Sequence, residues 1–278
     1  IVTMASSLVL CVLALLAAAS AAPGSRLVGG EHTTIEEFPY ITALTYRYPG
    51  PGIVVQRCVG SLLSSWHVLT TAYCFFGANL AQFEVRAGST YNLSGGVVVL
   101  MNQVFNYPGY VQSPRSGDVS IVLLLSPLGI SNTINVLYLP PPGTEISDGT
   151  PLQVVSWGFE NEGGPQLDTL KTVILNKVNL EQCQASYANS NGATISDRVI
   201  CAYAEGRGTC FGDAGAPMVM GRVVVGTASY YEECGSDDYP DIFSRVDTYT
   251  DWILSVAVPP TRDIKVPFPG ARRAPVVL

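Results

Sequence analysis

Cysteine and histidine are the residues of this chain whose types and spacing could bind a metal or form cross-links. Cys11 lies in an apolar N-terminal run, and the other cysteines form an even set: Cys58, Cys74, Cys183, Cys201, Cys210 and Cys234. The two histidines, His32 and His67, complete no CxxC or HExxH pattern, so we expect no metal site and no cofactor. In a secreted chain an even set favours three disulfides, although counting alone leaves their pairing open.

The N-terminal residues are typical of a secretory signal. An apolar run from Leu8 to Ala19 ends in the small residues Ser20-Ala21-Ala22 before Pro23. The run is short for a membrane span, which favours a cleaved signal over a membrane anchor. We therefore predict a signal peptide over residues 1–22, a short propeptide over 23–26, and a secreted, extracellular protein.

The composition favours a globular domain with an acidic balance. The 278 residues are 47% hydrophobic and 13% charged, which is ample for a core that folds without a partner. The 15 basic and 22 acidic residues give a net charge of −7. Because a nucleic-acid binder would present a basic face, we exclude that class. We also expect no membrane partner, and a monomer.

The pattern between about residues 27 and 258 predicts an all-β fold. Short runs rich in Val, Ile, Thr and Tyr are broken by Gly, Pro, Asn and Asp, which is typical of a sandwich or barrel. These runs include 53–59, 66–72, 97–105, 119–125, 152–157, 218–228 and 242–246. A helical period appears at Val246, Tyr249, Trp252, Ile253 and Val256, and a second short helix is predicted over 180–187.

Two further stretches interrupt this pattern. Residues 128–149, which contain Pro140-Pro141-Pro142-Gly143, indicate a crossing between two halves of the domain. Residues 259–278 lack any periodicity and indicate either a disordered tail or an artefact of gene prediction. Asn92-Leu93-Ser94 is an acceptor pattern for N-glycosylation, although so short a pattern also arises by chance.

Five segments resemble the chymotrypsin/trypsin family in order and spacing, and are most similar to secreted insect trypsin-like proteins. They are Arg26 to Gly30, Thr70 to Cys74, Asp118 to Leu123, Gly212 to Pro217 and Asp251-Trp252-Ile253. The resemblance implies a peptidase domain over 27–258 with two six-stranded antiparallel β-barrels, about 27–135 and 145–245, and a C-terminal helix at about 246–257. It also implies a cleft between the barrels and three disulfides, Cys58–Cys74, Cys183–Cys201 and Cys210–Cys234.

The resemblance places the family's catalytic triad on residues that cannot all perform its chemistry. In the family a serine hydroxyl attacks the scissile carbonyl, a histidine accepts its proton and a buried aspartate orients the imidazole. By position the aspartate is Asp118, the histidine is replaced by Tyr73 and the serine by Ala214. Alanine has no nucleophilic atom, and a neutral phenol is a poor base. His67 is too far along its strand from Tyr73 to substitute, at roughly 20 Å.

Other features of the family are implied to remain. The backbone N–H groups of Gly212 and Ala214 would form an oxyanion hole, which needs no side chain. Arg26-Leu27 resembles the activation site, where cleavage frees an α-amino group that pairs with Asp213. The alternative is that Asp213 is a buried carboxylate that the fold itself retains.

The specificity pocket departs from that of trypsins. The resemblance places Gly208 at its floor, Ser229 and Tyr231 on its wall, and Asp241 opposite, as in some broad-specificity invertebrate relatives. We expect Tyr231 to block the entrance, and Asp241 to be either an attractor for basic side chains or, as we favour, a loop acid exposed to solvent. Asp118, without an imidazole, needs other hydrogen-bond donors, for which Ser229 and the Tyr73 hydroxyl are candidates.

These residues predict a catalytically inactive serine protease homologue that acts by binding. The expected partners are proteins or peptides in the cleft: protease inhibitors, substrates or other proteases. The alternative is a digestive serine endopeptidase with residual or unconventional activity. A third hypothesis is a duplicated chain without a selected role.

Overall fold

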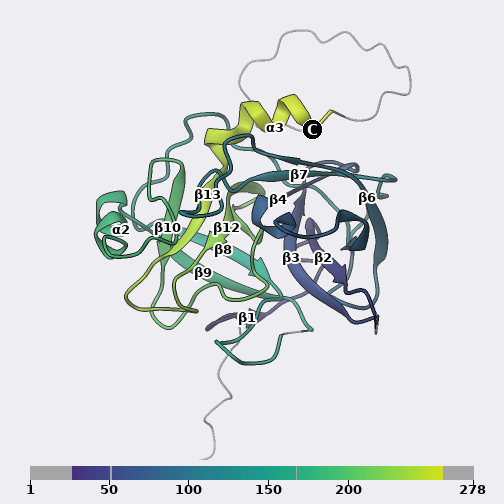
Figure 1. Ribbon diagram of the computed structural model, residues 1–278, viewed down its shortest axis with the longest axis horizontal. Helices are drawn as coiled ribbons and strands as arrows, with labels where there is room; N and C mark the ends of the chain where they lie inside the picture. The colour runs from purple at the N-terminus through teal and green to yellow at the C-terminus, as the bar shows by residue number, and fades with distance from the viewer. Residues whose placement is uncertain (1–26, 51, 167, 259–278) are drawn as a thin grey trace, which may run out of the picture.

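Two closed β-barrels lie side by side in the computed structural model, which describes residues 27–50, 52–166 and 168–258 (Figure 1). The predicted all-β fold with two six-stranded antiparallel barrels and a C-terminal helix is confirmed. The predicted signal peptide (1–22), propeptide (23–26) and tail (259–278) lie outside the described residues.

The first barrel closes in the order β2-β3-β4-β7-β6-β5. Alternation of side chains explains strands such as β5, where Phe83, Val85 and Ala87 are buried while Glu84 and Arg86 are partly exposed. The six strands are β2 (Ile41–Arg47), β3 (Val54–Leu62), β4 (His67–Thr70), β5 (Phe83–Ala87), β6 (Val97–Asn106) and β7 (Ser120–Leu124).

The second barrel closes because β8 pairs with both β9 and β11. Its strands are β8 (Pro151–Ser156), β9 (Lys171–Val178), β10 (Val199–Tyr203), β11 (Pro217–Met220), β12 (Val223–Tyr230) and β13 (Asp241–Arg245). The run at 218–228, which the sequence shows as one stretch, forms two strands that turn between Met220 and Val223.

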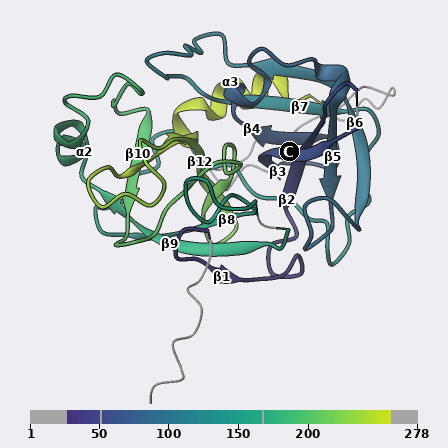
Figure 2. The same cartoon turned by 60° about the horizontal axis from the view of Figure 1, so that its bottom comes forward.

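The N-terminal strand β1 (Glu31–His32) does not belong to the first barrel. It pairs with β9 of the second barrel, at Glu31 with Thr172 and His32 with Lys171 (Figure 2). The sequence-based division, which counted residues 27–135 as the first barrel, is therefore wrong at this end. The pairing anchors the residues after Leu27 on the second barrel.

Short helices connect and close the barrels. They are η1 (Ala72–Phe75), η2 (Leu80–Gln82), α2 (Leu180–Ser186), η3 (Val246–Tyr249) and α3 (Thr250–Val256). The Asn179 side chain accepts from the N–H groups of Glu181 and Gln182, which explains why α2 begins there. The predicted C-terminal helix starts as a 3₁₀ turn and becomes α-helical only at Thr250. None of the helices in the described residues has the length and apolar character that a membrane-spanning helix needs.

The three disulfides join the pairs that the family resemblance implied: Cys58–Cys74, Cys183–Cys201 and Cys210–Cys234. Such cross-links fit an oxidising, extracellular setting.

The two barrels meet tightly around Gly215. The N–H of Val59 donates to the carbonyl of Ala214 at 2.8 Å. A Cβ at Gly215, whose φ is +83°, would lie 2.1 Å from the Val59 carbonyl oxygen and 2.3 Å from the Thr70 hydroxyl. Only glycine allows this approach, so the turn before β11 is fixed against the first barrel.

Candidate functional site

A cavity of about 450 Å³ lies between the two barrels. The first barrel and its connections contribute Tyr48, Arg57, Tyr73 and Arg115 to the lining, and the second contributes Glu162 and the segments 209–214 and 228–232. Five of the lining side chains are aromatic: Tyr48, Tyr73, Phe211, Tyr230 and Tyr231. The cavity is therefore a cleft lined by both aromatic and charged side chains.

Asp118 is buried at the back of this cleft, with 1% of its surface exposed. One carboxylate oxygen accepts from the backbone N–H of Tyr73 at 2.8 Å, and the other accepts from the Ser229 hydroxyl at 2.7 Å. The first donor is the Tyr73 backbone and not its hydroxyl, which the sequence had suggested. Burial raises the pKa of Asp118 to about 6, although both hydrogen bonds and the charge of Arg115 act to lower it.

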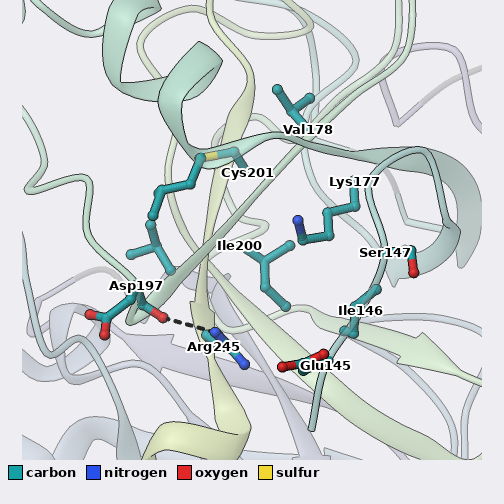
Figure 3. A pocket seen from close by; sticks show the side chains of 11 residues that line it. Glu145, Ile146, Ser147, Lys177, Val178, Asp197, Ile200, Cys201 and Arg245 are labelled. Atoms are coloured by element: carbon teal, nitrogen blue, oxygen red, sulfur yellow. Dashed lines mark hydrogen bonds between the residues drawn. The ribbon is translucent and has the colours of Figure 1, made fainter. Parts of the chain in front are cut away.

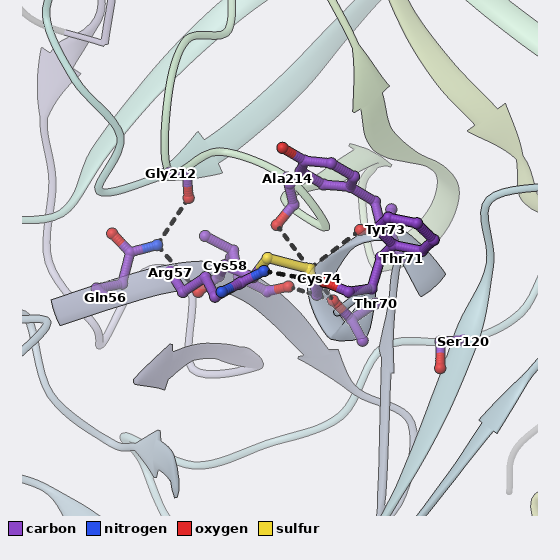
Figure 4. The surroundings of a disulfide bond; sticks show 12 residues. Gln56, Arg57, Cys58, Thr70, Thr71, Tyr73, Cys74, Ser120, Gly212 and Ala214 are labelled. Carbon is purple, nitrogen blue, oxygen red and sulfur yellow. Dashed lines mark hydrogen bonds between the residues drawn. A yellow bond between two sulfur atoms is a disulfide. The ribbon is translucent and has the colours of Figure 1, made fainter. Parts of the chain in front are cut away.

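Tyr73 and Ala214 lie beside the Cys58–Cys74 disulfide (Figure 4). Tyr73 belongs to η1, directly after β4, and 37% of its surface is exposed. Ala214 belongs to the turn before β11, and its methyl group packs against the core of the first barrel. Neither side chain offers a nucleophile or a base that acts at neutral pH.

The backbone around Gly212 is held in place from the first barrel. The side-chain amide of Gln56 donates to the Gly212 carbonyl at 2.7 Å (Figure 4). The side-chain amide of Gln166 in turn donates to the backbone carbonyl of Gln56 at 2.7 Å. Within the part of the chain that the structure describes, no group accepts from the N–H of Gly212 or Ala214. These two amides remain available to an incoming oxygen atom.

Asp213 is fully buried and accepts from the backbone N–H groups of Gly158, at 2.9 Å, and Cys210, at 2.8 Å. Burial raises its pKa to about 7, despite these donors. Leu27 is also buried, and the carbonyl of its neighbour Val28 accepts from the N–H of Gly208. The other activation residue of the sequence analysis, Arg26, lies outside the described residues.

The expected specificity pocket is only partly open to the cleft. Ser229 and Tyr231 line the cavity, whereas Gly208 and Asp241 do not. The rings of Phe211 and Tyr231, which both line the cavity, meet edge to face with centroids 5.7 Å apart.

The expectation that Asp241 is a solvent-exposed loop acid is wrong. Only 4% of its surface is exposed, and its carboxylate accepts from the N–H of Thr209 at 2.5 Å. It begins β13, and the Gly208 segment packs over it, which removes it from water. Burial raises its pKa to about 8, and the nearby charge of Asp213 acts in the same direction.

The sequence model of the family described as trypsin matches residues 27–253, which is most of the chain. The chain belongs to the trypsin family. It is 35% identical to "Trypsin, alkaline C" of Manduca sexta over 242 residues, which cover 85% of this chain and 94% of that protein. It is 34% identical to "Trypsin alpha" of Drosophila melanogaster over 233 residues, which cover 84% and 88%. The crystal structure of the scabies mite inactivated protease paralogue S-D1 has a similar fold, with a TM-score of 0.74 and 24% identity over 82% of this chain and 96% of the other.

Neither histidine reaches the cleft of this trypsin family member. His67 is buried on β4, and its Nδ1 lies 2.8 Å from the Ser64 hydroxyl. Burial lowers the pKa of His67, so it is a neutral part of the core. His32 is exposed on β1.

Sequence reasoning missed two residues that shape the site: Arg115, which lines the cleft, and Gln56, which is buried beside it. Gln56 fixes the Gly212 carbonyl, and Arg115 stacks on the Tyr73 ring, with its guanidinium carbon 3.8 Å from the ring centroid. Arg115 precedes the predicted triad residue Asp118 by only three positions, and this proximity in sequence could have indicated that Arg115 lies near the site. Gln56 shows no comparable signal, because its contact bridges segments 156 residues apart.

A second cavity, of about 240 Å³, lies beside α2 and away from this cleft (Figure 3). Its basic groups are already engaged: Lys177 pairs with Asp148, and Arg245 pairs with Asp247 and donates to the carbonyl of Asp197. We assign it no ligand.

Proposed function

We propose that this chain is a secreted, non-catalytic member of the trypsin family that acts by binding. The observation that carries the proposal is the pair Tyr73 and Ala214, which replaces both the base and the attacking atom of the triad. Loss of triad members lowers turnover by about 10⁶-fold, or roughly 8 kcal/mol of transition-state stabilisation. No serine or threonine occurs within Gly212 to Pro217 that could take over the attack.

The cleft retains what binding requires. Five aromatic side chains line it, and aromatic residues are the usual anchors of protein interfaces. The N–H groups of Gly212 and Ala214 have no acceptor among the described residues, so they can receive a ligand's carbonyl oxygen. A protein or peptide is the class of partner that fits, whether a protease inhibitor, a substrate or another protease.

The scabies mite neighbour, which has a similar fold, is described as an inactivated protease paralogue. At 24% identity that likeness supports the fold only, so the argument for inactivity depends on the residues of this chain.

The test is hydrolysis and active-site labelling of the purified protein. We expect no casein hydrolysis across the pH range and no labelling by a fluorophosphonate, which needs a nucleophilic serine. The matched positive control is the double variant Tyr73→His/Ala214→Ser, and its two single variants should remain inactive. Labelling of the wild-type protein, or casein hydrolysis at a rate typical of trypsins, would favour the digestive endopeptidase and end the proposal.

A further inference from the structure

Arg115 fills the part of the cleft that adjoins Tyr73. It lies in the connection between β6 and β7, and its guanidinium carbon is 3.8 Å from the Tyr73 ring centroid and 5.5 Å from that of Tyr230. A guanidinium between two aromatic rings is stabilised by cation–π attraction, more strongly where water is excluded. The position left without an imidazole is therefore covered by a cation from another segment.

The Arg115 side chain also donates a hydrogen bond to a backbone carbonyl of β12. Ser229 lies at an irregularity in the pairing of β12 with β13, between Ala228 and Tyr230. A carbonyl at such a position is free to accept from a ligand, as happens when an extended peptide adds to a strand edge. Here Arg115 Nη1 donates to the Ser229 carbonyl and takes that place.

The backbone of Arg115 is held by the second barrel. Its N–H donates to the Gly192 carbonyl at 2.8 Å, and its carbonyl accepts from the N–H of Thr194 at 2.9 Å. A Cβ at Gly192 would lie 1.8 Å from the Tyr230 hydroxyl, so glycine permits this loop to lie against the ring. These two hydrogen bonds hold the Arg115 backbone beside the second barrel, within reach of the Tyr73 and Tyr230 rings.

The second ring of the stack is also fixed. The Tyr230 hydroxyl donates to the Glu232 carboxylate at 2.8 Å, and the Ser190 hydroxyl donates to the same oxygen at 2.6 Å. The Glu232 carboxylate, which lines the same cavity as Arg115, is therefore already engaged by two donors.

We propose that Arg115 determines which ligands the cleft accepts, because it closes the half beside Tyr73 and Ser229 to an extended peptide. The proposal rests on the proposed function in one respect, because both require that a ligand binds in this cleft. The proposal leaves the half beside Arg57 and Gly212 open to a ligand, and Gly212 lies across the Cys58–Cys74 disulfide from Tyr73 (Figure 4). A partner engages that open half, or displaces Arg115.

The experiment compares binding to a defined probe, a Kunitz-type polypeptide inhibitor whose reactive loop is an extended strand. The wild-type protein, Arg115→Ala and Arg222→Ala are each titrated against the immobilised inhibitor. Arg222 is a matched control, because it also lies over a tyrosine ring, 5.7 Å from the Tyr138 centroid, and donates to a backbone carbonyl, but outside the cleft. We expect Arg115→Ala to bind at least about tenfold more tightly than the wild type, and Arg222→Ala to bind like the wild type. Equal or weaker binding by Arg115→Ala, or no binding by any of the three, would overturn the proposal.

A second measurement tests the stack without a ligand. Tetranitromethane nitrates exposed tyrosines, and mass spectrometry after digestion reports on Tyr73 alone. Because Arg115 covers one face of that ring, its nitration should be several-fold faster in Arg115→Ala and unchanged in Arg222→Ala. An unchanged rate in Arg115→Ala would also overturn the proposal. Casein hydrolysis by the wild type would instead refute the proposed function, but it would not change what the nitration rates show about Arg115.

Discussion

Ser229→Ala should make the stability of this protein depend more strongly on pH, because it removes one of the hydrogen bonds to the buried Asp118 carboxylate. A hydrogen bond to a charged group contributes about 1.5–3 kcal/mol, and each pKa unit corresponds to about 1.36 kcal/mol. The Asp118 pKa, about 6 in the wild type, should therefore rise by roughly one to two units in the variant.

The sign follows from which state holds the proton more tightly. Burial raises the Asp118 pKa above the ordinary 3.8, so the folded chain binds this proton more tightly than the unfolded chain. Its ionisation costs stability as the pH rises from about 4 through 6, by about 3 kcal/mol in the wild type. In Ser229→Ala this cost grows and extends to higher pH. The loss of unfolding free energy should thus be small near pH ~4, and about 1.5–3 kcal/mol larger near pH ~9.

Ser244→Ala is the matched control, because the Ser244 hydroxyl donates to the backbone carbonyl of the same residue, Asp118, at 2.8 Å. That acceptor is uncharged, so its loss should cost the same at both pH values. Urea denaturation at the two pH values measures the free energies, and ¹³C NMR of the Asp118 carboxyl measures its pKa. If Ser229→Ala loses the same free energy at both pH values and leaves this pKa unchanged, the reasoning is refuted.

Three further predictions concern single positions. Asn92 should remain unglycosylated when the chain is expressed through the secretory pathway of a host cell, because only 2% of its surface is exposed, and intact-protein mass spectrometry would reveal an added glycan. Asp241→Asn should raise the unfolding free energy more near pH ~9 than near pH ~5, because it removes a buried carboxylate whose pKa is raised to about 8 and keeps an acceptor for the Thr209 N–H; equal effects at both pH values would contradict this. Gly192→Ala should destabilise the protein by about 1–3 kcal/mol in thermal or urea unfolding, because its Cβ would overlap the Tyr230 hydroxyl, and a neutral result would show that the loop moves freely.

Local patterns and the family resemblance were sufficient to predict the barrels, the short helix at Leu180–Ser186 and the disulfide pairs. Alternation and turn residues act within a few positions, so the sequence displays them directly. The turn between β11 and β12 was missed because Val223 continues the apolar run across it.

Contacts between distant segments could not be predicted in the same way. Asp241 follows a proline in a loop-like stretch, and its burial depends on the Gly208 segment packing over it. The stack of Arg115 on Tyr73 depends on a loop of the second barrel that pairs with the Arg115 backbone. In both cases the residues that make the contact lie far along the chain, and no local periodicity of the sequence predicts the contact.

Together, Tyr73 and Arg115 change the source of the positive charge beside Asp118. In the family's triad that charge develops on the imidazole during the reaction, whereas here it is permanent and comes from the neighbouring connection. Tyr73→His alone would place the imidazole against the guanidinium, and this like charge would make it harder for the imidazole to accept a proton. The double variant Tyr73→His/Ala214→Ser should therefore recover less peptidase activity than the same variant combined with Arg115→Ala. A higher activity of the triple variant would show that Arg115, as well as Tyr73 and Ala214, limits catalysis in this cleft, and equal activities would refute this reasoning.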